Sequence, residues 1–153
     1  MEAASRVAAS TGRGSGRPVM LATLGVPFDR DATTFAVDAA VEAGVPLVVV
    51  NVVELPPLAM SVRMGHDQLP DDEEKADALR APAQLAHELG VRVERLRVRS
   101  PRPVAALLEL AADRRPGVLV FGPDRSRLRK RAYRKAAEAV RERAACLVWL
   151  ADD

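Results

Sequence analysis

The chain has 153 residues, enough for one domain with a single buried core. Aromatic residues make up only 3% of the sequence, which argues against the stacking platforms that bind single-stranded nucleic acid. The net charge of +2 arises within residues 1–17, so the remainder, with 20 of the 23 basic and 20 of the 21 acidic residues, has no overall field to attract nucleic acid or a membrane.

Residues 1–17 are rich in Ala, Ser, Gly and Arg and lack the long apolar segment of a secretory signal. This composition predicts a flexible tail, followed by one folded domain over residues 18–153. No run approaches the roughly 18 apolar residues that a membrane helix needs. Cys146 is the only cysteine and cannot form an internal disulfide, so we expect a cytoplasmic protein.

A strand and a helix are predicted to open the domain. Residues 19–24 form an apolar run that ends at Gly25, which indicates a buried strand. Asp29 or Asp31 can cap the following helix, because a carboxylate accepts the unpaired N–H groups of a first turn, and Gly44 ends it. The predicted apolar face of this helix comprises Phe35, Ala36, Ala39, Ala40 and Ala43.

The second strand gives the clearest signal in the sequence. Residues 47–53 are apolar and β-branched at most positions, which is typical of a parallel sheet covered on both faces. Residues 54–70 show no periodicity and are predicted to form a long loop. The acidic residues 71–74 favour a helix start, Gly90 ends that helix, and Pro82 predicts either a kink or a later start.

The remaining elements continue the alternation. Residues 91–98 alternate apolar and charged side chains with a change of phase at Arg95, which indicates an edge strand with a bulge. Pro101 or Pro103 begins a third helix, and Gly117 follows its end.

The last third of the chain completes the pattern. Residues 118–121 form a fourth strand, a fourth helix lies within 127–144, and residues 146–150 form a fifth strand. Right-handed crossovers place such alternating strands in one parallel sheet. We therefore predict an α/β fold: a single Rossmann-like domain with an open five-stranded parallel sheet and helices on both faces.

The order of these elements and the ending at residues 141–148 resemble the universal stress protein family, over about residues 18–150. The resemblance implies an adenine nucleotide alpha hydrolase-like fold, a role in stress response, and pairing of two copies through the last strand. In that family the fourth strand is followed by a nucleotide-binding motif: glycine, two residues, glycine, nine residues, glycine, then serine or threonine.

Laid on this chain, the family's motif begins at Gly122, but Arg125, Lys135 and Ala136 occupy its other three positions. Leu24 stands where family members carry an acidic residue that contacts the nucleoside. These losses amount to about 4–6 kcal/mol, or three to four decades in affinity. We predict a non-catalytic stress-response or regulatory domain that does not bind ATP in the family's usual mode and needs no cofactor.

Seven of the eleven residues 125–135 are Lys or Arg. One interpretation is an anion site for phosphate or a nucleotide, with Arg127, Arg131 and Arg134 on one helix face. That site would make the protein an anion- or nucleotide-binding regulator. The other interpretation is a solvated surface balanced by acids such as Glu138.

The carboxyl ends of parallel strands form the ligand crevice of an open α/β sheet. We expect that crevice between residues 25–28 and 122–127. The candidate ligand- or anion-binding residues are Thr23, Gly25, Gly122, Asp124, Arg125, Arg127 and Lys130.

No residue pattern supports catalysis. His66 and His87 have no second ligand at metal spacing, Cys146 begins an apolar strand, and the Gly-x-Ser-x-Gly motif is missing. We therefore expect neither an enzyme nor a metal site.

The last strand allows two arrangements. If it lies at the sheet edge, its unpaired backbone favours a homodimer, with Leu147, Trp149 and Leu150 at the interface. In the alternative, Trp149 packs under the fourth helix of its own chain.

Overall fold

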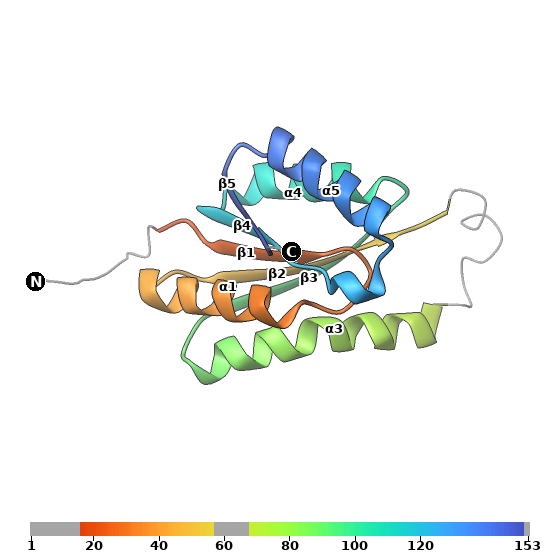
Figure 1. Ribbon diagram of the computed structural model, residues 1–153. Helices are drawn as coiled ribbons and strands as arrows, with labels where there is room; N and C mark the ends of the chain where they lie inside the picture. Colours follow the sequence, from red (N-terminus) through yellow and green to blue (C-terminus); the bar gives the residue numbers. More distant parts are fainter. Residues whose placement is uncertain (1–15, 57–67, 152–153) are drawn as a thin grey trace, which may run out of the picture.

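The computed structural model describes residues 16–56 and 68–151, and its strands form one sheet with helices on both faces (Figure 1). In chain order the elements are β1 (Val19–Thr23), α1 (Arg30–Ala43), β2 (Leu47–Glu54), α3 (Gln68–Glu88), β3 (Val93–Ser100), α4 (Pro103–Arg114), β4 (Val118–Phe121), the 3-10 turn η1 (Arg125–Arg127), α5 (Lys130–Arg143) and β5 (Leu147–Leu150). The predicted tail, apart from its last two residues, and most of the predicted loop 54–70 lie outside the described residues.

All strand pairs are parallel, and the sheet has the order β3-β2-β1-β4-β5. Helices α4 and α5 cover one face and α1 and α3 cover the other (Figure 1). The predicted five-stranded parallel α/β fold is therefore confirmed. No helix in the described segments is both long and apolar enough to cross a membrane.

Two apolar layers explain the sequence of β2. Val48 and Val50 belong to the layer beneath α4 and α5, whereas Leu47 and Val49 belong to the layer beneath α1 and α3. Successive side chains of a strand point to opposite faces, so a strand covered on both sides must be apolar at every position. At about 25 cal/mol per Å² of apolar area, such burial is the main favourable contribution to folding.

Helix α1 begins and ends as predicted but presents a different face. The Asp29 Oδ2 atom accepts a hydrogen bond from the Ala32 N–H at 2.9 Å, and Gly44 ends the helix in the left-handed conformation. The buried residues of α1 are Ala32, Ala36, Val37 and Ala40. The prediction was wrong for Phe35 and Ala43, which are exposed, because the helix is rotated so that its small residues contact the sheet.

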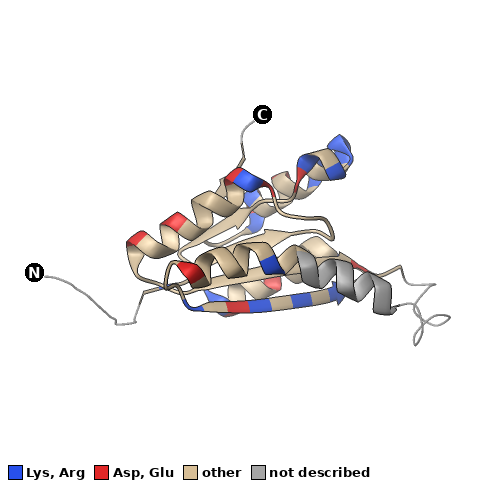
Figure 2. Ribbon diagram, turned by 90° about the horizontal axis from the view of Figure 1, so that it is seen from below, with Lys and Arg blue, Asp and Glu red and all other residues tan. Residues whose placement is uncertain are grey.

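The predicted bulge in the third strand is wrong. Every residue of β3 from Val93 to Ser100 pairs in turn with a residue of β2, without an insertion. Val93 packs in the α1–α3 layer, whereas Leu96 and Val98 pack in the α4–α5 layer. The apolar positions thus change face along a regular edge strand. From Arg95 to Ser100, Arg residues alternate with uncharged ones (Figure 2).

Helix α3 runs through Pro82 and starts well before it, so the predicted later start is wrong. A proline inside a helix removes one hydrogen bond and costs about 3 kcal/mol. Leu79, Ala83 and Ala86 lie on one face of this helix and are buried against the sheet and α1. Their burial offsets the cost of the proline.

Gly44 and Arg115 both end a helix in the left-handed region, with φ of 67° and 52°. A side chain in this conformation costs about 1–2 kcal/mol, and glycine avoids that cost. We expect Gly44→Ala to lower the free energy of unfolding by about 1–2 kcal/mol and Arg115→Gly to raise it by up to about 1 kcal/mol. Urea denaturation followed by circular dichroism measures both changes. Changes of the opposite sign would contradict the left-handed conformation of Gly44 and Arg115.

Candidate functional site

The loops that follow β1 and β4 lie against each other at the carboxyl end of the sheet. The Asp29 N–H donates to the Gly122 carbonyl at 2.9 Å, and the Asp124 N–H donates to the Pro27 carbonyl at 2.8 Å. Phe28 and Pro123 form an antiparallel bridge between these two bonds. The two loops expected to flank a crevice are thus joined by backbone hydrogen bonds.

Thr23, at the end of β1, pairs with Asn51 within β2, and both are fully buried polar residues. The Thr23 hydroxyl donates to the Val26 carbonyl at 2.8 Å, and the Gly25 N–H donates to Asn51 Oδ1 at 2.8 Å. Two of the predicted ligand contacts, Thr23 and Gly25, therefore have hydrogen-bond partners within the protein. The Asn51 Nδ2 atom has no partner within the described residues. No sequence pattern predicted that Asn51 would accept from the Gly25 N–H, because Asn51 is a single polar residue within a run of valines.

Gly122 is placed by packing against α1. A Cβ atom added at this position would collide with the Cβ of Ala32 and would lie 3.4 Å from Leu21 Cδ1. Asp124 caps the next turn, because its Oδ1 accepts from the Ser126 N–H at 3.0 Å and from the Ser126 hydroxyl at 2.7 Å. Both residues were predicted as ligand contacts, and both have these structural roles.

The other positions of the nucleotide motif lie in helical segments. Arg125 lies in η1, while Lys135 and Ala136 lie in the second turn of α5. An N–H group inside a helix donates to the carbonyl four residues earlier, so the amides of Lys135 and Ala136 are not available to a phosphate. The guanidinium carbon of Arg125 lies 4.3 Å from the centre of the Tyr133 ring, which stacks on Phe121.

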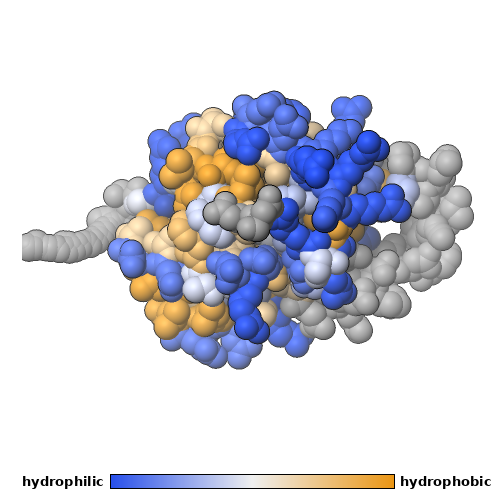
Figure 3. All heavy atoms as spheres, in the orientation of Figure 1, coloured by the Kyte–Doolittle hydropathy of each residue, from blue (hydrophilic) through white to orange (hydrophobic). Residues whose placement is uncertain are grey.

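A groove of about 910 Å³ lies along α5, between η1 and the end of β5. Its charged lining residues are Arg125, Lys130, Arg134, Glu138 and Arg141, and we call it the α5 groove. Hydrophilic surface gathers over α5 and η1 at the right of Figure 3, and an apolar area lies beside β5.

The sequence predicted Arg125 and Lys130 as anion ligands, and both line the α5 groove. Arg127 does not line it. The predicted face shared by Arg127, Arg131 and Arg134 is wrong, because α5 begins at Lys130 and Arg127 lies in η1. Arg141 was missed, although its spacing of eleven residues from Lys130 would have indicated a common face.

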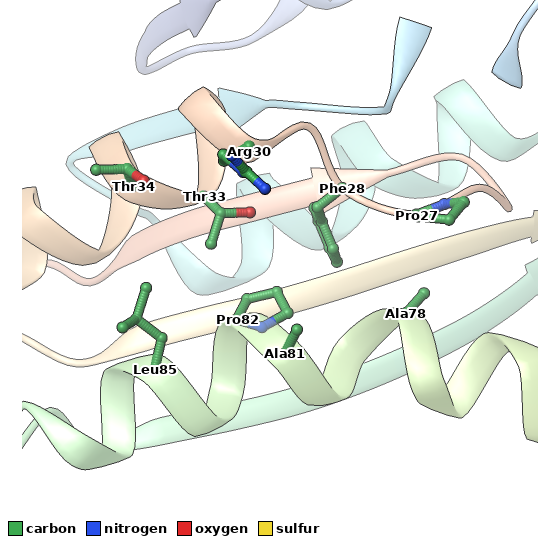
Figure 4. A pocket seen from close by; sticks show the side chains of 9 residues that line it. All are labelled: Pro27, Phe28, Arg30, Thr33, Thr34, Ala78, Ala81, Pro82 and Leu85. Atoms are coloured by element: carbon green, nitrogen blue, oxygen red, sulfur yellow. The ribbon is translucent and has the colours of Figure 1, made fainter. Parts of the chain in front are cut away.

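A second pocket, of about 330 Å³, separates α1 from α3. Phe28 points from the β1–α1 loop toward α3, where Pro82 and Leu85 lie (Figure 4). The Thr33 hydroxyl at its edge already donates to the Asp29 carbonyl at 3.0 Å. Its lining is mostly apolar, so it does not fit an anion.

Titratable groups show little sign of catalytic chemistry in the described part of the chain. Burial raises the pKa of the Cys146 thiol, which disfavours the nucleophilic thiolate. Within residues 16–56 and 68–151, no three His, Cys, Asp or Glu side chains gather as a metal site would require. His66, for which the sequence offers no second ligand at metal spacing, lies outside the described residues.

Strand β5 lies at the edge of the sheet, as the dimer prediction requires. Trp149 stacks on Phe35 of α1, with ring centres 4.6 Å apart and planes 10° from parallel. The alternative in which Trp149 packs under the fourth helix is therefore wrong, since α1 covers the opposite face. Leu147 is 72% exposed, and Leu150 is partly buried beside α5.

The universal stress protein family model matches residues 16–151, so the chain belongs to the universal stress protein family. No protein among the curated sequences compared matches the chain.

Solved structures of this family share the fold. A universal stress protein from Archaeoglobus fulgidus in complex with dAMP is 22% identical, with a TM-score of 0.63 over 88% of this chain and 96% of that one. A family protein from Arabidopsis thaliana with AMP bound is 17% identical, with a TM-score of 0.58 over 88% and 89% of the two chains. A universal stress protein from Lactobacillus plantarum is 20% identical, with a TM-score of 0.59 over 91% and 100%.

We expect Gly122→Ala to lower the free energy of unfolding by about 1–3 kcal/mol, because the added methyl group must displace α1. Gly117→Ala is the matched control, since its Cβ would meet Arg17 at an ordinary 3.6 Å. Urea denaturation of both variants without any ligand measures the difference. Equal stability of the two variants would contradict a packing role for Gly122.

Proposed function

We propose that this chain is a non-catalytic regulatory domain of the universal stress protein family that does not hold ATP in the family's usual mode. The observation that carries this proposal is the placement of Lys135 and Ala136 inside α5. A phosphate cradle needs successive free N–H groups aimed at the anion, and these two amides have helical partners.

The region around the motif supports the same conclusion. Backbone hydrogen bonds join the loops that would have to admit the nucleoside, and Leu24 offers no carboxylate there. The relatives solved with dAMP and AMP show that the fold can hold a nucleotide. In this chain, the residues at the corresponding motif positions favour helix formation and packing instead.

AMP is a suitable probe of the family's mode, because it carries a nucleoside but only one phosphate. We expect no thermal shift with AMP, whereas a ligand at a hundred times its dissociation constant stabilises a protein by about 2.7 kcal/mol. Differential scanning fluorimetry measures the shift. Stabilisation by AMP that persists in Arg134→Gln would refute the proposal, since Arg134 lies in the α5 groove and outside the motif.

We also propose that the domain forms a homodimer through β5. An edge strand presents unpaired backbone groups that a second copy can pair with. Leu147 adds a large apolar side chain that is 72% exposed at this edge. Trp149 is already stacked on Phe35 of its own chain. We therefore expect Leu147 to be the main apolar contact of β5 with a second copy.

The exposed leucine of β5 provides the test of the dimer. We expect Leu147→Glu to weaken dimerisation at least tenfold, which corresponds to about 1.4 kcal/mol. Leu89→Glu is the matched control, because Leu89 is 51% exposed at the far end of α3. Sedimentation equilibrium measures both variants. A monomeric parent protein, or equal loss in both variants, would rule out this interface.

The second candidate function is an anion-binding regulator that uses the basic segment 125–135. In the described part of the chain, no carboxylate lies within ion-pair distance of Lys130, Arg134 or Arg141. This observation favours the second candidate function. Glu138 therefore does not balance these cations by direct contact. Unpaired cations that line a groove are available to an external anion.

A further inference from the structure

We infer that the α5 groove binds a linear chain of phosphate groups, as found in inorganic polyphosphate or in the phosphate chain of a nucleotide. The inference rests on the anion-binding function proposed above and identifies its ligand. Of the four motif positions, only Arg125 lines this groove. The inference therefore does not depend on a phosphate cradle near Gly122.

The basic side chains of the α5 groove form a row. Lys130, Arg134 and Arg141 are separated by four and seven residues on α5, which places them within about 40° of one another around the helix. At 1.5 Å per residue, the row extends about 16 Å along the axis. A single phosphate can contact one or two members of such a row, whereas a linear polyanion can contact all of them.

Arg125 of η1 adds a fourth cation to the groove lining. Its guanidinium carbon lies 4.3 Å from the centre of the Tyr133 ring, which also lines the groove. With four cations and one carboxylate, Glu138, the lining carries a net charge of +3. Charges held in a groove attract an anion more strongly than the same charges on an open surface.

The first turn of α5 gives a second argument. The amino end of a helix is electropositive and normally carries acidic or capping side chains. Here the capping residue is Arg129, which makes no side-chain hydrogen bond to the helix, and no acidic residue lies in the first turn. Lys130 adds positive charge at this end, and an external anion relieves the resulting repulsion.

The floor of the groove distinguishes a phosphate chain from nucleic acid. It consists of small or aliphatic residues, Ala137, Leu150 and Ala151, together with Tyr133. Tyr133 is only 8% exposed and is covered by Arg125, so no aromatic ring is available for a base to stack on. Binding of single strands depends on such stacking, and the groove therefore favours the phosphate chain alone.

The experiment is isothermal titration of the full chain with inorganic tripolyphosphate, orthophosphate, ATP, adenosine and a single-stranded oligonucleotide. We expect tripolyphosphate to bind at least tenfold more tightly than orthophosphate, ATP to match tripolyphosphate, and adenosine not to bind. Binding of ATP but not of tripolyphosphate would overturn the inference. Tighter binding of the oligonucleotide would assign the groove to nucleic acid and would also overturn it.

Matched charge changes on the same helix locate the site. Arg134→Gln and Arg141→Gln are expected to weaken tripolyphosphate at least tenfold, while Arg131→Gln and Arg143→Gln, outside the groove lining, change it less than twofold. Glu138→Gln is expected to tighten binding severalfold, because it removes the only acid of the lining. Equal effects of the inner and outer arginines would show general charge attraction and would overturn the inference.

These outcomes distinguish the proposed absence of the family's nucleotide mode from the proposed phosphate binding in the α5 groove. Loss of ATP binding in Arg134→Gln supports the α5 groove and leaves the absence of the family's nucleotide mode intact. Retention of ATP binding in Arg134→Gln, together with binding of adenosine, would refute both. Failure of every anion to bind would refute the groove and the anion-binding function, and would leave the absence of the family's nucleotide mode intact.

Discussion

The contact of α1 with the end of β4 at Gly122 determines the shape of the whole carboxyl edge of the sheet. Ala32 lies so close to this glycine that a side chain at residue 122 would displace the helix. The same approach brings the loops after β1 and β4 together, where Asp29 and Asp124 donate to each other's loop. At this edge, where an open parallel sheet normally accepts a ligand, backbone hydrogen bonds join the two loops.

This constraint bears on the role that we propose for the basic residues at the glycine positions of the motif. The amides of Lys135 and Ala136 are hydrogen bonded within α5 and are not available to a phosphate, whereas the side chains of Arg125 and Arg134 line the α5 groove. The positive charge of Arg125 and Arg134 consequently lies in the α5 groove. In a family whose solved members hold dAMP or AMP, we propose that this chain binds anions by side-chain charge.

Local signals in the sequence predicted most of the fold. The element order, the Asp29 cap and the Gly44 end of α1 follow from periodicity and backbone preferences within a few residues. A bulge in β3 and burial of Phe35 were predicted wrongly. Both depend on which neighbouring elements cover these residues, and a local pattern does not show that. For the candidate site, Arg125 and Lys130 were predicted, but Arg141 was missed. Its spacing from Lys130 indicates a common helix face, but only the end of β5 beside α5 shows that this face lines a groove.

The sequence by itself determined an alternating α/β chain, its family resemblance and the departures from the nucleotide motif, because these depend on residue type and spacing alone. Only the tertiary structure decided that Trp149 stacks on Phe35 and that Gly122 contacts α1. The physical reason is the strand order, which places β4 beside β1 although the two are distant in the chain. Contacts between such distant segments depend on the packing of the whole sheet, and no local pattern encodes them.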